Sequence, residues 1–527
     1  MSRDPRAPIL ARNHIVSSRP FNATFPQTAP EWLARAVVLL CLFTGAAWAE
    51  ERVVYPDGSG EYPNLQAAIN ASSDGDIVSL AAGDFVQWAI DPLGKAITIR
   101  AQDGPGTVTI NGGTVFYIYS GEGPDTVFEG ITFLRTAWDD DSSIECTEVS
   151  PTFLDCVFQD APIRLERSGP EFRRCTFLGG DYAINLEGNC PVLVENCRFR
   201  KMGLGIGWYR GAGGTIRIAD TAFEGCVGGI SGEDFIGNLQ IERTEFRDNR
   251  FGMDIDGTSS AGRFTLTSCV FESNIDFGAD IQGRESTVID CAFRSHQNLG
   301  DFGALYVTNG TLDGCLFEGN RARHAGAVYG NRLTVRSCTF QNNQAIGYGE
   351  EDGYGGAMIL LGGGTSVEEC LFASNEGGYG GALCLLDPTT VRDCTFVRNR
   401  GYHASVFQLG LSNFEFERII VFDNRGGPTT DCEPGAGLEI SCSDFHGNEA
   451  GDWTGCAADW EFANANISSD PLFCDVETGD FSLAAASPCL ASNNGCGDMG
   501  VFGQGCEPTP VVERSWGWIK GQFAERP

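Results

Sequence analysis

The stretch Cys338-Thr-Phe-Gln-Asn-Asn343 contains the pattern that decides the fold: a cysteine, a phenylalanine two residues later and an asparagine three residues after that. Cys-x-Phe occurs nine times, and Ile131/Phe133, Thr221/Phe223 and Thr244/Phe246 are degenerate copies. The phenylalanines step by 19–25 residues, with one step of 32; they are Phe133, Phe158, Phe177, Phe199, Phe223, Phe246, Phe271, Phe293, Phe317, Phe340, Phe372 and Phe396. Self-similarity at such a short period predicts one repeat domain rather than several globular ones.

Each repeat predicts strands rather than helices, because it is shorter than the ~34 residues of paired-helix repeats and rich in Phe. Alternation places Cys and Phe on one face, and both favour burial. Asparagines follow at Asn249, Asn274, Asn320, Asn343, Asn375 and Asn399, and small-residue corners follow at Gly326-Ala327, Gly355-Gly356-Ala357 and Gly380-Gly381-Ala382. Each unit therefore reads strand, Asn turn, glycine corner, strand.

One coil cannot bury its apolar face alone, but coils stacked about 4.8 Å apart can. Stacking aligns the asparagines into a column whose side chains bond along the stack. Parallel strands wrapped without helices, with the usual crossover handedness, predict an all-β, right-handed parallel β-helix solenoid. The segment Pro63–Asn70 predicts a short helix that covers the first coil, and the Cys-rich end predicts a C-terminal cap.

Phe-x-x-Asn followed by Gly-Gly-Ala resembles the repeats of polymorphic outer-membrane proteins, within the wider right-handed β-helix (pectin-lyase-like) superfamily. The resemblance covers about residues 130 to 450. It implies the fold but no single activity, because that superfamily includes lyases, hydrolases, esterases, adhesins and passive scaffolds.

The charge balance excludes one class of partner. The chain has 36 basic and 70 acidic residues, a net charge of −34, and such a surface repels nucleic-acid phosphates. Hydrophobic residues make up 42% of the chain, which excludes global disorder. We expect no nucleic-acid partner and a monomeric protein.

The N-terminal segment predicts export. The apolar run Ala36–Ala49 ends in Ala47-Trp48-Ala49, which is typical of a signal peptide cleaved after Ala49. We expect a signal peptide at 1–49 with a long charged region, a β-helix at 50–445, a Cys-rich cap at 446–506, and a linker and tail at 507–527. The mature chain is expected to be secreted or held at the cell surface, without a transmembrane segment.

Export favours disulfides among the cysteines near the C-terminus. The candidates are Cys432, Cys442, Cys456, Cys474, Cys489 and Cys496, and the nearest-neighbour pairs are Cys432–Cys442, Cys456–Cys474 and Cys489–Cys496. Cys506 makes the number odd, so the connectivity stays open. No Cys-x-x-Cys spacing indicates a metal site, and the nine Cys-x-Phe cysteines are expected to be buried thiols that fill the core.

No catalytic motif is recognisable. The polygalacturonase-type set of carboxylates and histidine is missing, and the pectinesterase-type pattern matches only in the N-terminal region. The chain has three lysines, and no nucleophile elbow occurs. The catalytic residues therefore stay unknown.

One column of side chains remains as a candidate ligand site. Aligning the repeats on their glycine corners places Asp276, Asp301, His324, Tyr354, Tyr379 and Tyr402 in one column. An insertion in one repeat adds further side chains beside it, and insertions often mark the binding face. The candidate ligand-binding residues are His324, Tyr348, Glu350, Glu351, Asp352, Tyr354, Glu376, Tyr379, Tyr402 and His403.

Aromatic faces in such a strip stack on sugar rings, and carboxylates accept hydrogen bonds from hydroxyl groups or hold a calcium ion. We expect no cofactor, with calcium as the alternative. The alternative interpretation is that ladders of like residues occur in any stacked solenoid. We therefore expect a non-catalytic protein that binds a polysaccharide or a cell-surface ligand. A polysaccharide lyase or glycoside hydrolase with an unrecognised site, and a passive structural spacer, stay open as alternatives.

Overall fold

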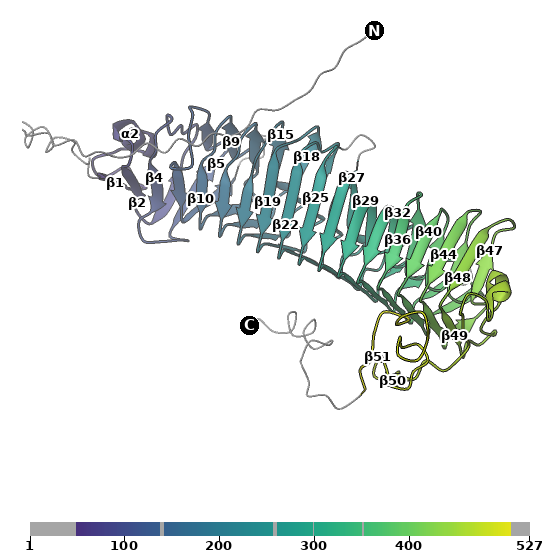
Figure 1. Ribbon diagram of the computed structural model, residues 1–527. Coiled ribbons are helices and arrows are strands. Elements are labelled where there is room, and N and C mark those ends of the chain that lie inside the picture. The colour runs from purple at the N-terminus through teal and green to yellow at the C-terminus, as the bar shows by residue number, and fades with distance from the viewer. Residues whose placement is uncertain (1–48, 137–141, 257–260, 299, 350–351, 507–527) are drawn as a thin grey trace, which may run out of the picture. The chain divides into compact units, whose positions relative to one another are not determined.

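The computed structural model describes residues 49–136, 142–256, 261–298, 300–349 and 352–506 (Figure 1). The contacts divide the chain into residues 1–48 and 49–527, and every described residue belongs to the second unit. Residues 1–48 of the expected signal peptide, Glu350, Glu351 and the expected tail lie outside the described residues.

One coil shows how the repeat builds the fold. Strand β32 (Val328–Arg336) covers two faces and bends at Arg332, whose φ is +57°. Strand β33 (Thr339–Gln341) forms the third face, and β34 (Gln344–Ala345) begins the return to β35 (Met358–Leu361) one coil further on. Strands β32 and β35 pair in parallel, with Val328 opposite Met358. The predicted order of strand, Asn turn, glycine corner and strand is confirmed.

Parallel pairing continues through the stack. Among the described residues it produces one sheet of 28 strands and another of 16. A third sheet has five short strands, which are β31 (Arg321–Ala322), β34, β38 (Glu376–Tyr379), β42 (Arg400–Ala404) and β46 (Arg425–Gly426). Figure 1 shows the strands of successive coils side by side, from β1 (Glu51–Val54) to β49 (Asp444–His446). The protein is an all-β parallel solenoid, as the repeat predicted.

A column of phenylalanine rings fills the interior. From Phe133 to Phe396 each ring stacks on the next at centroid distances between 4.4 and 5.2 Å. The nine Cys-x-Phe cysteines are buried free thiols, as expected. Because both columns come from β-strand alternation, each of these coils places its Phe and its Cys, or the Ile or Thr that replaces the Cys, at the same positions of the core.

A second column, of asparagines, satisfies the backbone at the turn after each phenylalanine. Asn320 Nδ2 donates to the carbonyl of Phe293 at 3.0 Å, and its backbone N–H donates to Asn343 Oδ1 at 3.1 Å. The same bonds recur coil after coil until the Asn448 N–H donates to Asp452 Oδ1 at 2.9 Å. The carboxylate of Asp452 therefore ends the ladder, which the repeat pattern did not predict.

His296 occupies one position of this ladder. Its ring is fully buried, Nδ1 lies 3.3 Å from the carbonyl oxygen of Asn274, and Nε2 has no partner among the described residues. Burial lowers the pKa of His296 to about 4. A neutral ring is therefore kept where its neighbouring coils place an uncharged amide.

Helices close the two ends of the stack. Helix α2 (Leu65–Ala71) buries Leu65 and Ile69, and the Asn64 side chain caps its N-terminus by accepting from the Ala67 N–H at 2.9 Å. This is the predicted capping helix. At the other end, the 3₁₀ helix η1 (Gly455–Trp460) contributes the buried Ala457 to the main core.

The segment after η1 packs against the flank of the solenoid. It contains the antiparallel pair β50 (Phe473–Asp475) and β51 (Asp480–Leu483). Phe481 packs with Leu371 and Val397, which lie on outward positions of the 16-stranded sheet. The Val501 N–H donates to Thr395 Oγ1 at 3.1 Å. The Cys-rich region thus covers a side of the last coils as well as their end.

Three disulfides join this region, and the nearest-neighbour pairing is wrong. The pairs are Cys432–Cys456, Cys442–Cys496 and Cys474–Cys506, with Cα atoms 6.0, 5.6 and 5.5 Å apart. Cys489, a predicted disulfide candidate, is instead a buried free thiol. Its Sγ donates to Asp444 Oδ2 at 3.2 Å. Pairing follows which segments meet in space, because the cap folds back onto coils far away in sequence.

The buried histidine predicts a pH effect on stability. The folded-state pKa of His296 lies below its value of 6.5 in an unfolded chain, so the unfolded state takes up a proton first as the pH falls. Between pH 6.5 and 5 this group should remove about 2 kcal/mol of stability. His296→Asn should abolish this loss and provide an acceptor for the Asn274 N–H. Denaturant titrations at pH 6.5 and 5 measure the free energy of unfolding of the parent and the variant. If both His296→Asn and His296→Gln lose as much stability between these pH values as the parent does, the prediction is wrong.

Asp444 predicts an effect of the opposite sign. Its carboxyl is buried beneath the cap, and desolvation raises its pKa from 3.8 to about 6. The stability carried by the neutral carboxyl is fully present below pH 3.8 and is lost as the pH rises through about 6. Asp444→Asn should therefore stabilise the protein by up to about 3 kcal/mol at pH 7. Thermal unfolding of both proteins at pH 4 and 7 tests this, and an equal difference at both pH values would refute it.

Candidate functional site

The candidate column lies where the five-stranded sheet turns into the 28-stranded sheet. Its glycines permit the turn because the backbones of successive coils nearly touch there. A Cβ atom on Gly356 would overlap the carbonyl oxygen of Gly381, and Gly380 has a φ of +72°. The residue before each glycine corner is therefore held on a rigid bend, and its side chain projects from the outside of the coil.

Four aromatic side chains form the aromatic corner, which we define as His324, Tyr354, Tyr379 and His403. The rings of Tyr354 and Tyr379 stack at 4.5 Å and 8°. The Tyr379 ring stacks on His403 at 4.0 Å and 12°, while His324 meets Tyr354 edge-on at 5.5 Å. His324 Nδ1 also accepts from the Tyr354 N–H at 3.4 Å. The predicted column is thus a ring stack that crosses several coils.

The member contributed by the coil after Tyr379 is His403, whereas the repeat alignment placed Tyr402 there. Gly377 lies opposite Gly401 and Leu383 opposite Phe407, and the same offset relates Tyr379 to His403 rather than to Tyr402. Tyr402 is 59% exposed, and its ring meets His403 edge-on at 5.0 Å.

The remaining predicted residues surround the stack unevenly. Tyr348 is 73% exposed, meets His324 edge-on at 6.1 Å and carries the guanidinium of Arg323 4.7 Å from its ring centre. Asp352 is exposed near the same bend. Glu376 lies on the neighbouring five-stranded sheet, where Gln344 Nε2 donates to it at 3.4 Å and Arg400 lies 3.8 Å away.

Next to the aromatic corner, outward-facing side chains of the 28-stranded sheet form the outer strip. It contains Tyr306, Tyr329, Ile359, Cys384 and Gln408, which occupy one register position on β29 (Leu305–Asp313), β32, β35, β39 (Leu383–Leu385) and β43 (Phe407–Leu409). The rings of Tyr306 and Tyr329 lie 5.3 Å apart. Ile359 and Cys384 pack with Tyr329 in an apolar cluster separate from the main core. The sheet therefore has an apolar outer surface between its two corners.

Burial controls the ionisation of this surface. Desolvation raises the pKa of Cys384 to about 12, with a contribution from the charge of Glu433. Partial burial also raises the pKa values of Tyr329 and Tyr354 above their ordinary range. At neutral pH these groups are therefore uncharged. Ile359, Cys384 and Gln408 are buried, so the half-buried Tyr306 and Tyr329 are the members of the strip that solvent reaches.

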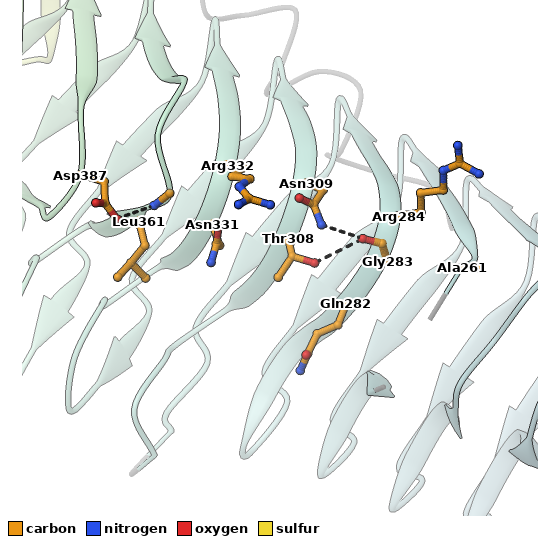
Figure 2. Close-up of a pocket in the computed structure, with 11 residues that line it drawn as sticks. Ala261, Gln282, Gly283, Arg284, Thr308, Asn309, Asn331, Arg332, Leu361 and Asp387 are labelled. Carbon is orange, nitrogen blue, oxygen red and sulfur yellow. Dashed lines mark hydrogen bonds between the residues drawn. The ribbon is translucent and has the colours of Figure 1, made fainter. Parts of the chain in front are cut away.

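At the opposite corner of the same sheet lies a groove of about 680 Å³, here called the corner groove. It is lined by Gln282, Arg284, Asn309, Asn331, Arg332 and Asp387, among others (Figure 2). Thr308 and Asn331 lie two residues beyond Tyr306 and Tyr329 on their strands, so the groove continues from the outer strip. The repeat pattern did not predict the outer strip or the groove. Their residues occupy the same position in successive coils, but the residue type at that position changes from coil to coil.

The described residues contain neither a metal-binding cluster nor a membrane-spanning helix. In the ranges that the structure describes, no group of three His, Cys, Asp or Glu side chains is placed to hold a metal ion. Within the same ranges, no helix is long and apolar enough to cross a membrane.

The comparisons with known proteins agree with this architecture. The model of the right handed beta helix region matches residues 137–293, 257–355 and 284–450, which together span more than half of the chain. The chain belongs to this family. The narrower resemblance to polymorphic outer-membrane-protein repeats stays a prediction. No curated protein matches the sequence.

Three solved structures illustrate how distant the similar folds are. A complex of alginate lyase AlyF-OU02 with G6 is 11% identical, covers 88% of this chain and 97% of its own, and has a TM-score of 0.35. The catalytic unit of a GH87 alpha-1,3-glucanase from Streptomyces thermodiastaticus strain HF3-3 is 12% identical, with coverages of 81% and 72% and a TM-score of 0.29. Pectate lyase Pel9A is 12% identical, with coverages of 88% and 98% and a TM-score of 0.23.

The close approach at the glycine corner predicts a stability loss. Gly356→Ala forces a methyl group against the Gly381 carbonyl and should destabilise the protein by about 1–3 kcal/mol. Gly363→Ala is a matched control, because the nearest atom to its added Cβ is Pro388 Cδ at 4.0 Å. Urea titrations of both variants measure the effect, and equal unfolding midpoints would contradict the close approach.

Proposed function

We propose that this protein binds a glycan without cleaving it, on the outer face formed by the aromatic corner and the half-buried Tyr306 and Tyr329 of the outer strip. The observation that carries the proposal is the stack of Tyr354, Tyr379 and His403, whose rings follow one another at 4.5 and 4.0 Å on the outside of the coils. Because the faces of these rings cover one another, the stack presents its ring edges outward. The edges of aromatic rings carry partial positive charge and attract the hydroxyl oxygens of a sugar. A row of ring edges therefore offers consecutive contacts to a chain of sugars.

The rigidity of the site supports binding. Backbone bonds hold the corner, since the Ala325 N–H donates to the Tyr354 carbonyl and the Gly355 N–H donates to the Tyr379 carbonyl, both at 2.8 Å. The rings are also restrained by one another. A site ordered before its ligand arrives loses less entropy on binding than a mobile loop does.

The exposure of the corner supports a ligand as well. Tyr354 is 38% exposed, and Tyr348 and Tyr402 are 73% and 59% exposed. Apolar ring surface left in water is stabilised when a ligand covers it.

The proposal includes export to the cell exterior. The three disulfides near the C-terminus support it, because disulfides persist in oxidising compartments and are rare in the cytosol. The buried thiols are compatible with such a compartment, since burial keeps them from oxidants and raises the pKa of Cys315 and Cys338 well above the usual value.

The test is binding of the purified protein to a panel of polysaccharides, with calcium or with a chelator, while new chain ends are assayed. Tyr354→Ala and Tyr379→Ala should each weaken binding about tenfold, since covering roughly 50 Å² of ring is worth about 1.2 kcal/mol. Tyr354→Phe and Tyr379→Phe should bind nearly as well as the parent, because they keep the ring stack and its outward edges.

Tyr209→Ala is the matched control, because Tyr209 is 78% exposed on β18 (Leu204–Arg210), many coils away. Its binding should equal that of the parent. Release of new chain ends by the parent protein would instead establish a lyase or hydrolase. If no polysaccharide of the panel binds, the proposal is wrong and the interpretation as a structural spacer is favoured.

A further inference from the structure

The corner groove is built from side chains of successive coils. Gln282 pairs in register with Thr308, Thr308 with Asn331, and Asn331 with Leu361, so four neighbouring strands each place one side chain at the same position. A glycine follows at position 362, where an added Cβ would crowd Asn331 Oδ1 and Arg332 Cγ. The absence of a side chain at Gly362 therefore keeps the groove open.

Several polar groups of the groove already have partners. Asn309 Nδ2 donates to the carbonyl of Gly283 at 3.0 Å, and Thr308 Oγ1 donates to the same oxygen at 3.5 Å (Figure 2). The carboxylate of Asp387 accepts from the Gly362 N–H at 2.8 Å. These bonds hold the walls of the corner groove in place, and the other polar side chains of the groove remain available to bind a ligand.

The two guanidinium groups are the exception. Arg284 and Arg332 are exposed along the groove, and neither has an ion-pair or hydrogen-bond partner among the described residues. Most described arginines of this acidic protein lie against a carboxylate, as Arg174 does with Asp155 at 2.8 Å. Among the described residues, these two cations outnumber the one carboxylate that lines the groove, that of Asp387. The groove is therefore a local site for a negative charge, because guanidinium groups bind carboxylate and sulfate oxygens through paired N–H donors.

We propose that the corner groove binds an acidic substituent, a carboxylate or a sulfate ester, carried by the glycan whose neutral sugars lie on the outer strip and the aromatic corner. Arg284 and Arg332 contact the anion, and Asn331 donates an amide N–H to it. The proposal rests on the proposed glycan binding and adds the chemical class of the ligand. The two corners are joined by strands of about four residues, or about 13 Å, so one ligand can reach both.

The charge of the protein limits how acidic that ligand is. The net charge of −34 repels a polymer with a charge on every sugar, and this repulsion acts over the Debye length of about 8–10 Å at physiological salt. Two arginines can offset one anionic group but not a long row of them. The groove therefore favours a sparsely charged glycan over both a neutral chain and a dense polyanion.

Four soluble cellulose derivatives test this inference at about 0.1 M salt: hydroxyethyl cellulose, lightly carboxymethylated cellulose, lightly sulfated cellulose and heavily sulfated cellulose. The lightly substituted polymers should bind about tenfold more tightly than the neutral one, and the heavily sulfated one no more tightly than the light ones. In Arg284→Ala/Arg332→Ala the gain should disappear, while the affinity for hydroxyethyl cellulose stays unchanged.

Arg198→Ala/Arg217→Ala removes the same charge from two exposed arginines outside the groove and should keep the gain. Equal affinity for the neutral and lightly substituted polymers would overturn the inference. So would tightest binding of the heavily sulfated polymer, or an equal loss of affinity for the lightly substituted polymers in both double variants. If none of the four polymers binds, this inference is wrong; the proposed function fails as well only if the wider panel is also blank.

Discussion

Backbone hydrogen bonds between parallel strands hold each coil on the next, and every other feature depends on their register. Because Phe317 lies opposite Phe340 and Phe340 opposite Phe372, a residue type that recurs in the repeat becomes a column in space. The phenylalanine stack, the thiols and the asparagine ladder all arise in this way. A one-residue slip would turn each of these side chains to the opposite face, so the buried columns and the backbone pairing enforce one another.

The short strand that carries each phenylalanine is bounded by two tight turns. In the coil of β33, Ser337 and Asn342 both have left-handed conformations, with φ values of 52° and 56°. Small polar residues tolerate this region better than bulky ones. The amide group of the buried Asn343 then satisfies the turn of the preceding coil, since Nδ2 donates to the Phe317 carbonyl and Oδ1 accepts from the Asn320 N–H. Each coil is thereby forced round three sides within little more than twenty residues.

The same geometry makes the exterior suitable for an extended ligand. Corner residues such as Tyr354 and Tyr379 are held by backbone contacts that the glycines allow, so their rings lie one above the other without a mobile loop. The outer strip and the corner groove lie on the same strands. Fixed spacing between coils thus gives the face a regular series of contacts, which suits a polymer with its own repeat.

The sequence by itself determined the solenoid, its columns and the region of the aromatic corner, because in-register stacking turns periodicity directly into spatial order. Only the tertiary structure decided that His403, and not Tyr402, continues the ring stack, because that coil lacks the Gly-Gly-Ala corner and its offset is set by the strand pairing. The disulfide partners and the buried contact of Cys489 with Asp444 depend on how a non-repeating segment folds back. The corner groove arises from residues of different types at one position, and only the tertiary structure shows that Arg284 and Arg332 lie there with no ion-pair partner in the part of the chain that is described.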